Sequence, residues 1–193
     1  MTSSWPSVPL GEVLEERQEE PRDHALASGQ VRIVARIGFD DGRIQLRANG
    51  QTRTKMILIR PGDLVVSGIN AAKGAIAVYG GENKAPIAAT IHYGAYIPRK
   101  ERVEARYLWW MLRSGIFRDL LNQHLPGGIK TELKAKRLLA VPIPLPDLQE
   151  QQRILACIEK LAAKVEKARE LRRQSVDEVQ RFGNSMVSAI LSK

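Results

Sequence analysis

The fold is decided by the stretch Pro142-Ile143-Pro144-Leu145-Pro146-Asp147-Leu148-Gln149-Glu150-Gln151-Gln152-Arg153-Ile154. Its three alternate prolines exclude a helix and predict an extended segment, because proline fixes φ and the residue before it avoids the α region. Asp147 then offers a capping carboxylate, and Glu150 three residues later completes an Asp-x-x-Glu capping box. We therefore predict that a helix begins at Leu148.

This helix is expected to be unusually long. From Leu148 to about Leu191 the sequence has no proline and a single glycine, Gly183. At 1.5 Å per residue the helix would measure roughly 65 Å, which is more than one small domain needs. A helix of this length needs a packing partner.

The apolar residues of this helix follow a heptad pattern that is interrupted once, at Arg172 and Ser175. A terminal helix packed on its own domain is one interpretation. The other is antiparallel pairing, with a second copy of the chain or with another helix. For a homodimer, the expected dimerisation residues are Ile154, Ile158, Leu161, Val165, Val179 and Phe182.

The predicted class is α+β, with a mixed-sheet domain over residues 1–146 and a long coiled-coil-forming helix over residues 147–193. The net charge of +9 favours a polyanionic partner, most simply double-stranded DNA. No apolar run approaches the length of a membrane span, so no membrane partner is expected. The N-terminus has no signal-peptide pattern, and Cys157 is the only cysteine, which together predict a cytoplasmic chain.

Residues 43–59 are the most informative part of the domain, because Asn49-Gly50 is a hairpin signal. A two-residue loop would pair Ala48 with Gln51. A three-residue loop ending at Gly50 pairs Arg47 with Gln51 instead, and we prefer it because it separates polar from apolar side chains. One face then carries a set suited to phosphates and base edges, namely Arg43, Gln45, Arg47, Gln51, Arg53 and Lys55. An ordinary solvated sheet face is the alternative.

The remaining elements of the domain are read from their patterns. Residues 30–37 predict a strand with Val31, Ile33 and Ala35 on one face, and the acidic run at residues 12–20 suggests a solvated helix face. Residues 106–121 predict one buried helix. A basic loop before the prolines adds the candidate DNA-binding residues Lys130, Lys134 and Lys136.

Few residues suggest catalysis. Asp63 followed by Glu82-Asn83-Lys84 is similar to the Asp…Glu-x-Lys set with which nucleases bind magnesium, but Asn83 follows two glycines in an expected turn, where such enzymes have a strand. The three histidines are scattered, so no metal site is predicted. A magnesium-dependent nuclease using Asp63, Glu82 and Lys84 remains one alternative. A coiled-coil scaffold that binds nucleic acid without sequence preference is another.

Several segments, in this order along the chain, resemble type I restriction–modification specificity subunits. They are Trp5…Leu10-Gly11-Glu12-Val13, Gly62-Asp63-Leu64-Val65-Val66-Ser67, Gly74-x-Ile76-Ala77-Val78, Tyr107-Leu108-Trp109-Trp110-Met111-Leu112-Arg113-Ser114, Gly127-Gly128 and Ile143-Pro144-Leu145-Pro146-x-x-x-Glu150-Gln151-x-x-Ile154. The resemblance implies a non-catalytic DNA target recognition domain followed by a conserved helix. It also implies two partners, an adenine methyltransferase subunit that carries S-adenosylmethionine and a restriction–translocase subunit, with no cofactor in this chain.

The sequence departs from this family in one respect. Such subunits generally carry two recognition domains and two conserved helices, whereas this sequence has one of each. It is either a natural half-subunit that dimerises or a fragment of a longer protein. The heptad pattern favours the half-subunit. Two identical halves related by a twofold axis are expected to read a bipartite palindromic site.

Overall fold

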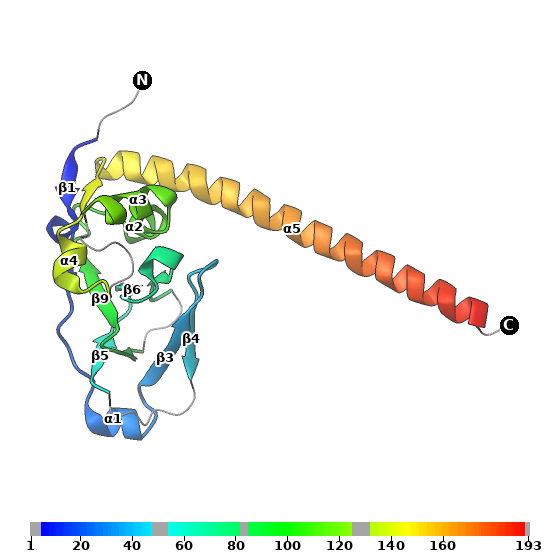
Figure 1. Cartoon of the computed structure of the whole chain (residues 1–193), viewed down its shortest axis with the longest axis horizontal. Coiled ribbons are helices and arrows are strands. Elements are labelled where there is room, and N and C mark those ends of the chain that lie inside the picture. Colours follow the sequence, from blue (N-terminus) through cyan, green and yellow to red (C-terminus); the bar gives the residue numbers. More distant parts are fainter. Residues whose placement is uncertain (1–4, 48–53, 82–84, 125–131, 192–193) are drawn as a thin grey trace. The chain divides into compact units, whose positions relative to one another are not determined.

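The computed structural model describes residues 5–47, 54–81, 85–124 and 132–191. Its strands are β1 Ser7–Pro9, β2 Leu14–Glu16, β3 Arg32–Ile37, β4 Ile44–Arg47, β5 Met56–Ile59, β6 Leu64–Ser67, β7 Ile76–Val78, β8 Ile87–Thr90, β9 Tyr93–Pro98 and β10 Pro142–Pro144. Its helices are α1 Asp23–Ala27, α2 Ala105–Leu112, α3 Gly115–His124, α4 Ala135–Leu139 and α5 Leu148–Leu191, with short 3₁₀ turns η1 Leu10–Glu12 and η2 Ala71–Lys73 (Figure 1).

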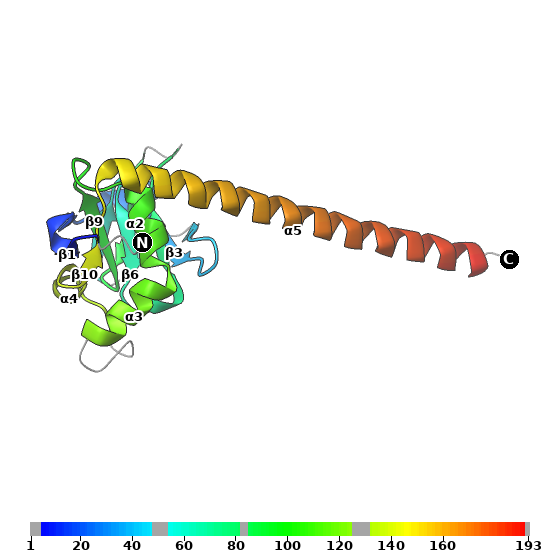
Figure 2. The same cartoon turned by 90° about the horizontal axis from the view of Figure 1, so that it is seen from above.

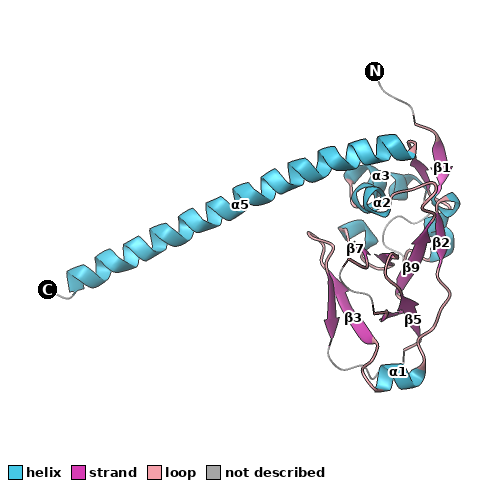
Figure 3. Ribbon diagram, turned by 180° about the vertical axis from the view of Figure 1, so that it is seen from behind, coloured by secondary structure: helices cyan, strands magenta, loops and turns pink. Residues whose placement is uncertain are grey.

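Contacts divide the chain into two units, residues 1–152 and residues 153–193. The first turn of α5 therefore belongs to the first unit, which we call the domain. Its strands and helices form the α+β arrangement that the sequence predicted (Figure 3). The second unit is the remainder of α5. As a whole, α5 runs from Leu148 to Leu191, which are the bounds that the sequence predicted. Among the described helices, none is both long and apolar enough to cross a bilayer.

Two four-stranded sheets form the domain. One has the order β2-β9-β6-β7 and is antiparallel, and the other has the order β4-β3-β8-β5 with β3 and β8 parallel. A buried cluster joins the sheets, with Val34 and Ile59 from one and Val65 and Ala95 from the other. A smaller cluster around Ile33 is covered by side chains of α1. The predicted mixed sheet is confirmed.

The predicted hairpin between residues 43–47 and 51–55 is wrong. β4 pairs with β3, so that Gln45 lies across from Arg36 and Ile44 from Ile37, and β5 lies at the opposite edge of the same sheet. The turn before β4 makes the hairpin instead, because Gly42 adopts φ 64° there and its N–H donates to the Gly38 carbonyl at 3.0 Å. Residues 48–53, with Gln51 and Arg53, lie outside the described residues.

The strand expected at residues 30–37 exists, but its predicted alternation is wrong. β3 has a register shift between Val34 and Arg36, where one residue of β3 has no counterpart on β4. Such a bulge changes which face the following side chains occupy. Ala35 is consequently exposed, whereas Ile33, Val34 and Ile37 are all buried.

Two helical predictions also need correction. The acidic run at residues 12–20 contains the strand β2, which pairs with β9, because Val13 and Leu14 are buried and fix this segment at a sheet edge. The single helix expected at residues 106–121 is two helices. The Ser114 hydroxyl separates them by donating to the Met111 carbonyl at 2.7 Å and accepting from the Phe117 N–H at 3.3 Å.

The proline segment is extended, as predicted, and forms β10 opposite β1, with Ile143 paired to Val8. Prolines at alternate positions leave only the intervening N–H groups for bonding, and these point to one edge. Leu145 donates to the Pro6 carbonyl at 2.9 Å, and Leu10 donates to the Val141 carbonyl at 2.9 Å. The prolines therefore produce a strand with one bonded edge.

Two side chains fix the start of α5 to the domain. The predicted cap is confirmed, because Asp147 Oδ1 accepts from the Glu150 N–H at 2.8 Å. Gln151 is fully buried, and its amide bonds three backbone groups. Oε1 accepts from the Glu104 N–H at 2.9 Å, and Nε2 donates to the carbonyls of Arg102 at 3.0 Å and Pro146 at 2.8 Å.

We predict that Gln151→Leu, which keeps the side-chain volume, lowers the free energy of unfolding by roughly 2–4 kcal/mol because it leaves buried backbone groups without partners. Chemical denaturation would measure this. The matched control is Gln149→Leu at an exposed neighbouring position, which should change stability by less than about 0.5 kcal/mol. Equal effects of the two substitutions would contradict the role of Gln151.

Candidate nucleic-acid interface

A basic face lies on the β3–β4 hairpin. Alternation along β4 turns Ile44 and Leu46 toward the core and leaves Arg43, Gln45 and Arg47 exposed, as the sequence predicted for these residues. Arg36, on β3, joins them and donates from Nε to Gln45 Oε1 at 2.8 Å. We call Arg36, Arg43, Gln45 and Arg47 the β4 face. It offers three guanidinium groups and one amide on adjacent strands.

Contacts with Arg113 and Trp109 fix the turn between β3 and β4, which precedes this face. Arg113, the residue that follows α2, donates from Nη2 to the Phe39 carbonyl at 2.7 Å, and its guanidinium stacks on Trp109 with 4.2 Å to the ring centroid. Trp109 in turn donates from Nε1 to the Ile76 carbonyl at 2.9 Å. A side chain at Gly42 would meet both that carbonyl and the Trp109 ring within 3 Å, so the turn requires glycine there.

The charge of the β4 face is only partly neutralised. The Asp41 carboxylate accepts from the Arg43 N–H at 2.9 Å and lies 3.7 Å from Arg43 Nε. The Arg43 side chain is nonetheless 85% exposed. An exposed pair of this kind contributes little energy and dissociates readily when a phosphate competes.

The other predicted DNA-binding residues do not join this face. Lys55 lies beside β5 at the far edge of the sheet and pairs with Glu20 at 2.7 Å. Lys134 and Lys136 are exposed at α4, and Figures 1 and 2 place α4 and the β3–β4 hairpin on opposite sides of the domain. Lys130 lies outside the described residues. The domain therefore carries two separate basic regions rather than one.

Asp63, the central residue of the nuclease alternative, has a structural role. Its carboxylate is buried and binds Arg17 with both oxygens, at 2.6 and 2.8 Å, and it accepts from the Arg60 N–H at 2.8 Å. The hydrogen bond to Asp63 raises the pKa of Arg17 above its usual value. Glu82 and Lys84 lie outside the described residues. Among the described residues, no three His, Cys, Asp or Glu side chains gather where they could hold a metal.

The apolar seam of α5 is exposed over most of its length. Leu161, Val165, Val179 and Phe182 are each at least half exposed, whereas Ile154 and Ile158 are half-buried. Two further exposed apolar residues, Leu171 and Val176, flank the polar interruption at Arg172 and Ser175. Single exposed apolar side chains are common on proteins, but a continuous row of them indicates an interaction surface.

Sequence reasoning missed two features of the domain. It recognised Gln151 as part of a motif without seeing its three backbone bonds, although a glutamine next to a helix cap in a proline-bounded segment was a usable signal. It also left Arg36 out of the basic face. The pairing of β3 with β4 brings Arg36 there, and the Asp41-Gly42 turn between these consecutive strands was a usable local signal for that hairpin.

The family model for the type I restriction modification DNA specificity domain matches residues 3–173. The chain belongs to this family. The match covers the whole described domain and about half of α5. It includes the buried Gln151 and the β4 face.

Known relatives of this specificity domain agree with the match. The type I restriction enzyme MjaVIII specificity subunit of Methanocaldococcus jannaschii is 25% identical over 99 residues, which are 51% of this chain and 22% of that protein. The HsdS subunit from Thermoanaerobacter tengcongensis has a similar fold, with a TM-score of 0.68, 23% identity and coverage of 90% of this chain and 46% of that one.

A chain from a type I R-M system, studied for its complex assembly and conformational transition, gives a TM-score of 0.66 at 21% identity. The match covers 94% of this specificity domain chain and 44% of that chain. The chain thus spans less than half the length of the relatives it matches. At these identities the two solved structures establish the fold, which is α+β with a long C-terminal helix.

We predict that Asp63→Asn lowers the free energy of unfolding by about 2 kcal/mol, because it leaves the largely buried Arg17 guanidinium with only the more exposed Glu19 carboxylate as its charged partner. The control is Glu12→Gln, which breaks the exposed Glu12–Arg102 pair at 2.9 Å and should cost at most about 1 kcal/mol. Thermal denaturation with and without magnesium would measure both. Stabilisation by magnesium that Asp63→Asn abolishes would show that Asp63 binds metal and would contradict its structural role.

Proposed function

We propose that the chain is the DNA-recognition component of a type I restriction–modification system. The match of the specificity-domain family to residues 3–173 carries this proposal. In it, the chain selects the DNA sequence and has no catalytic activity of its own. A separate adenine methyltransferase subunit carries S-adenosylmethionine and modifies the site, and a restriction–translocase subunit cleaves DNA.

The geometry of the β4 face supports DNA binding. A two-stranded β-ribbon fits the major groove of B-DNA, where arginine pairs with guanine O6 and N7 and glutamine pairs with adenine N6 and N7. The β3–β4 hairpin presents Gln45 and Arg47 from the edge strand β4, Arg43 from the turn just before it, and Arg36 from the neighbouring strand β3. Guanidinium groups that do not reach a base would contact phosphates and fix the register.

We further infer that the chain works as a homodimer held by α5. The heptad positions favour antiparallel self-pairing, in which an a residue of one helix packs against a d residue of the other. In one register four apolar layers match, namely Ile158 with Ala189, Leu161 with Met186, Val165 with Phe182, and Ala168 with Val179, while the outermost residue Ile154 falls opposite Lys193. The same register places Arg172 opposite Ser175, so the polar interruption of one helix packs against the polar interruption of the other.

A parallel pair is less favourable. It would stack each residue on its own copy, which places two Arg172 charges in one layer and two Phe182 rings in another. Like charges that face each other in the core destabilise a coiled coil, so the two Arg172 side chains disfavour parallel pairing. Antiparallel pairing with a twofold axis gives two identical recognition domains, and such a dimer reads an inverted repeat with a spacer.

Chemical crosslinking tests the helix pairing. In a Cys157→Ser background, Val165→Cys and Phe182→Cys chains should crosslink through a short bismaleimide only when they are mixed, because these positions face each other in the antiparallel dimer. Either variant crosslinking to itself would indicate parallel pairing. A monomer at tens of micromolar, seen by light scattering of the unmodified chain, would refute self-pairing altogether.

DNA-binding measurements test the β4 face. Arg43→Ala and Arg47→Ala should each weaken specific binding, by about 1–3 kcal/mol where the side chain holds a guanine edge. A phosphate contact would instead lower affinity for every sequence and flatten the salt dependence. Arg118→Ala, an exposed arginine of α3 outside the β4 face, is the control.

If the Arg43→Ala/Arg47→Ala double variant bound its target as tightly as the Arg118→Ala control, DNA would be read elsewhere. The exposed Lys134 and Lys136 would then be the next candidates. Competition with random DNA at physiological salt separates sequence-specific recognition from the scaffold alternative, because specific sites bind typically a thousandfold or more tightly.

A further inference from the structure

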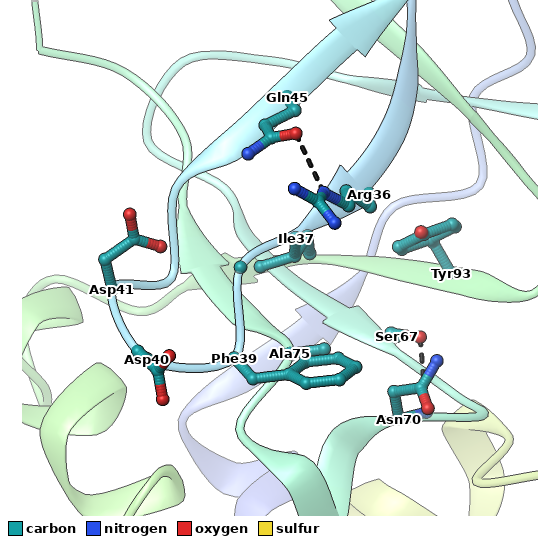
Figure 4. A pocket seen from close by; sticks show the side chains of 11 residues that line it. Arg36, Ile37, Phe39, Asp40, Asp41, Gln45, Ser67, Asn70, Ala75 and Tyr93 are labelled. Atoms are coloured by element: carbon teal, nitrogen blue, oxygen red, sulfur yellow. Dashed lines mark hydrogen bonds between the residues drawn. The ribbon is translucent and has the colours of Figure 1, made fainter.

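A pocket of about 400 Å³ opens beside the β4 face. Its walls come from three separate segments: the β3–β4 turn with Phe39 and Asp40, the connection from β6 to η2 with Asn70, and Tyr93 at the start of β9 (Figure 4). Gln45 lines the pocket and also belongs to the β4 face. The pocket is therefore continuous with the surface proposed to bind DNA.

The walls of this pocket are fixed by contacts outside it. The Phe39 carbonyl accepts the Arg113 hydrogen bond, and a side chain at Gly74 would lie 2.9 Å from that carbonyl. On the opposite wall, the Ser67 hydroxyl accepts from the Asn70 N–H at 3.3 Å. Backbone atoms held in this way provide a preformed site, which is the usual condition of small-ligand pockets.

Several polar groups of the pocket make no hydrogen bond. Among the described residues, nothing hydrogen-bonds the side-chain amide of Asn70 or the hydroxyl of Tyr93, and the carboxylate of Asp40 makes no hydrogen bond but interacts electrostatically with Arg113. The Tyr93 hydroxyl is protonated and can donate at neutral pH, and burial raises its pKa further above the ordinary value. Phe39 adds a flat apolar ring that is 47% exposed. The site thus combines two aromatic rings, Tyr93 and Phe39, with donors and acceptors that can bind a ligand; Lys73 Nζ lies 5.8 Å from the centroid of the Phe39 ring.

These groups define the class of ligand. The pocket lining carries the carboxylates of Asp40 and Asp41 against the single guanidinium of Arg36, so it has no excess positive charge with which to hold a phosphate, and the ligand's charged backbone is better placed outside. A planar ring edged with donors and acceptors fits instead, because amides and carboxylates bind the exocyclic amines of bases and aromatic side chains stack on base faces. A base inside a duplex exposes only its edges and cannot enter a recess. It must leave the stack to do so.

We propose that this pocket receives a single nucleobase extruded from the duplex that binds the β4 face, with Phe39 stacking on it and Asn70 and Asp40 reading its edge. The inference rests on the proposed function. It adds a second mode of sequence recognition, because bases that pair weakly or fit the pocket well would be selected without contact to the groove.

The test uses the full chain without any methyltransferase subunit, so that no other protein extrudes a base. The target selected from a random duplex library is remade with each position in turn either mismatched or abasic. Both changes remove the cost of unpairing, but only the mismatch keeps a base that can fill the pocket. At one position in each half-site, the mismatched duplex should bind about fivefold to a hundredfold tighter than the abasic one.

Substitutions in the pocket test whether it causes the preference for the mismatched over the abasic duplex. Phe39→Ala and Asn70→Ala should bring the mismatch-to-abasic ratio at that position to about one, and Asn122→Ala, an exposed asparagine of α3, should leave it unchanged. A ratio near one at every position in the unmodified chain, with sequence-specific binding intact, would overturn the pocket proposal and leave the proposed function standing.

Two further outcomes are also decisive. If deoxynucleoside monophosphates bound the pocket in NMR titrations while the ratio stayed near one, the pocket would be a free-nucleotide site and the proposal would fail. Absence of any sequence preference in the library selection would overturn the proposed function itself, together with the inference that rests on it.

Discussion

The buried amide of Gln151 is the interaction on which the domain's organisation depends. It bonds backbone groups of two segments that are far apart in sequence: residues 102 and 104 just before α2, and residue 146 at the end of the proline segment. A fully buried amide is stable only when its donors and acceptors are satisfied, and here all three contacts are to backbone. Asp147 caps the same turn of α5. The helix therefore begins at one fixed place on the domain.

The same region explains which parts of the fold could be predicted. The proline segment, the Asp147 cap and the length of α5 depend on neighbouring residues, and each was predicted correctly. The exposure of Arg43, Gln45 and Arg47 was also predictable, because side-chain alternation along a strand is a local property. Strand pairing is not local. β3 joins β8 in parallel across more than forty residues, and no turn signal reveals that connection.

The candidate site shows the same limit. The sequence indicated three residues of the β4 face but not Arg36, which pairing across the hairpin brings beside Gln45. It placed Lys55 on that face, whereas the sheet order separates them. The pocket beside the face was beyond sequence reasoning, because its walls come from three segments that only the packed sheets bring together. Asp63 resembled a catalytic residue in sequence, and its buried pairing with Arg17 shows a structural one.

In the proposed function the two parts of the chain have different tasks. The domain would present a basic edge strand and a recessed pocket to DNA, and the apolar seam of α5 would pair two copies antiparallel, with its polar interruption packed against its own copy. The central claim is that two copies read two inverted half-sites. The most direct measurement is selection of duplexes from a random library by the purified chain, followed by sequencing. The account predicts two identical inverted half-sites separated by a constant spacer. A single asymmetric motif, or no enrichment over the starting library, would contradict it.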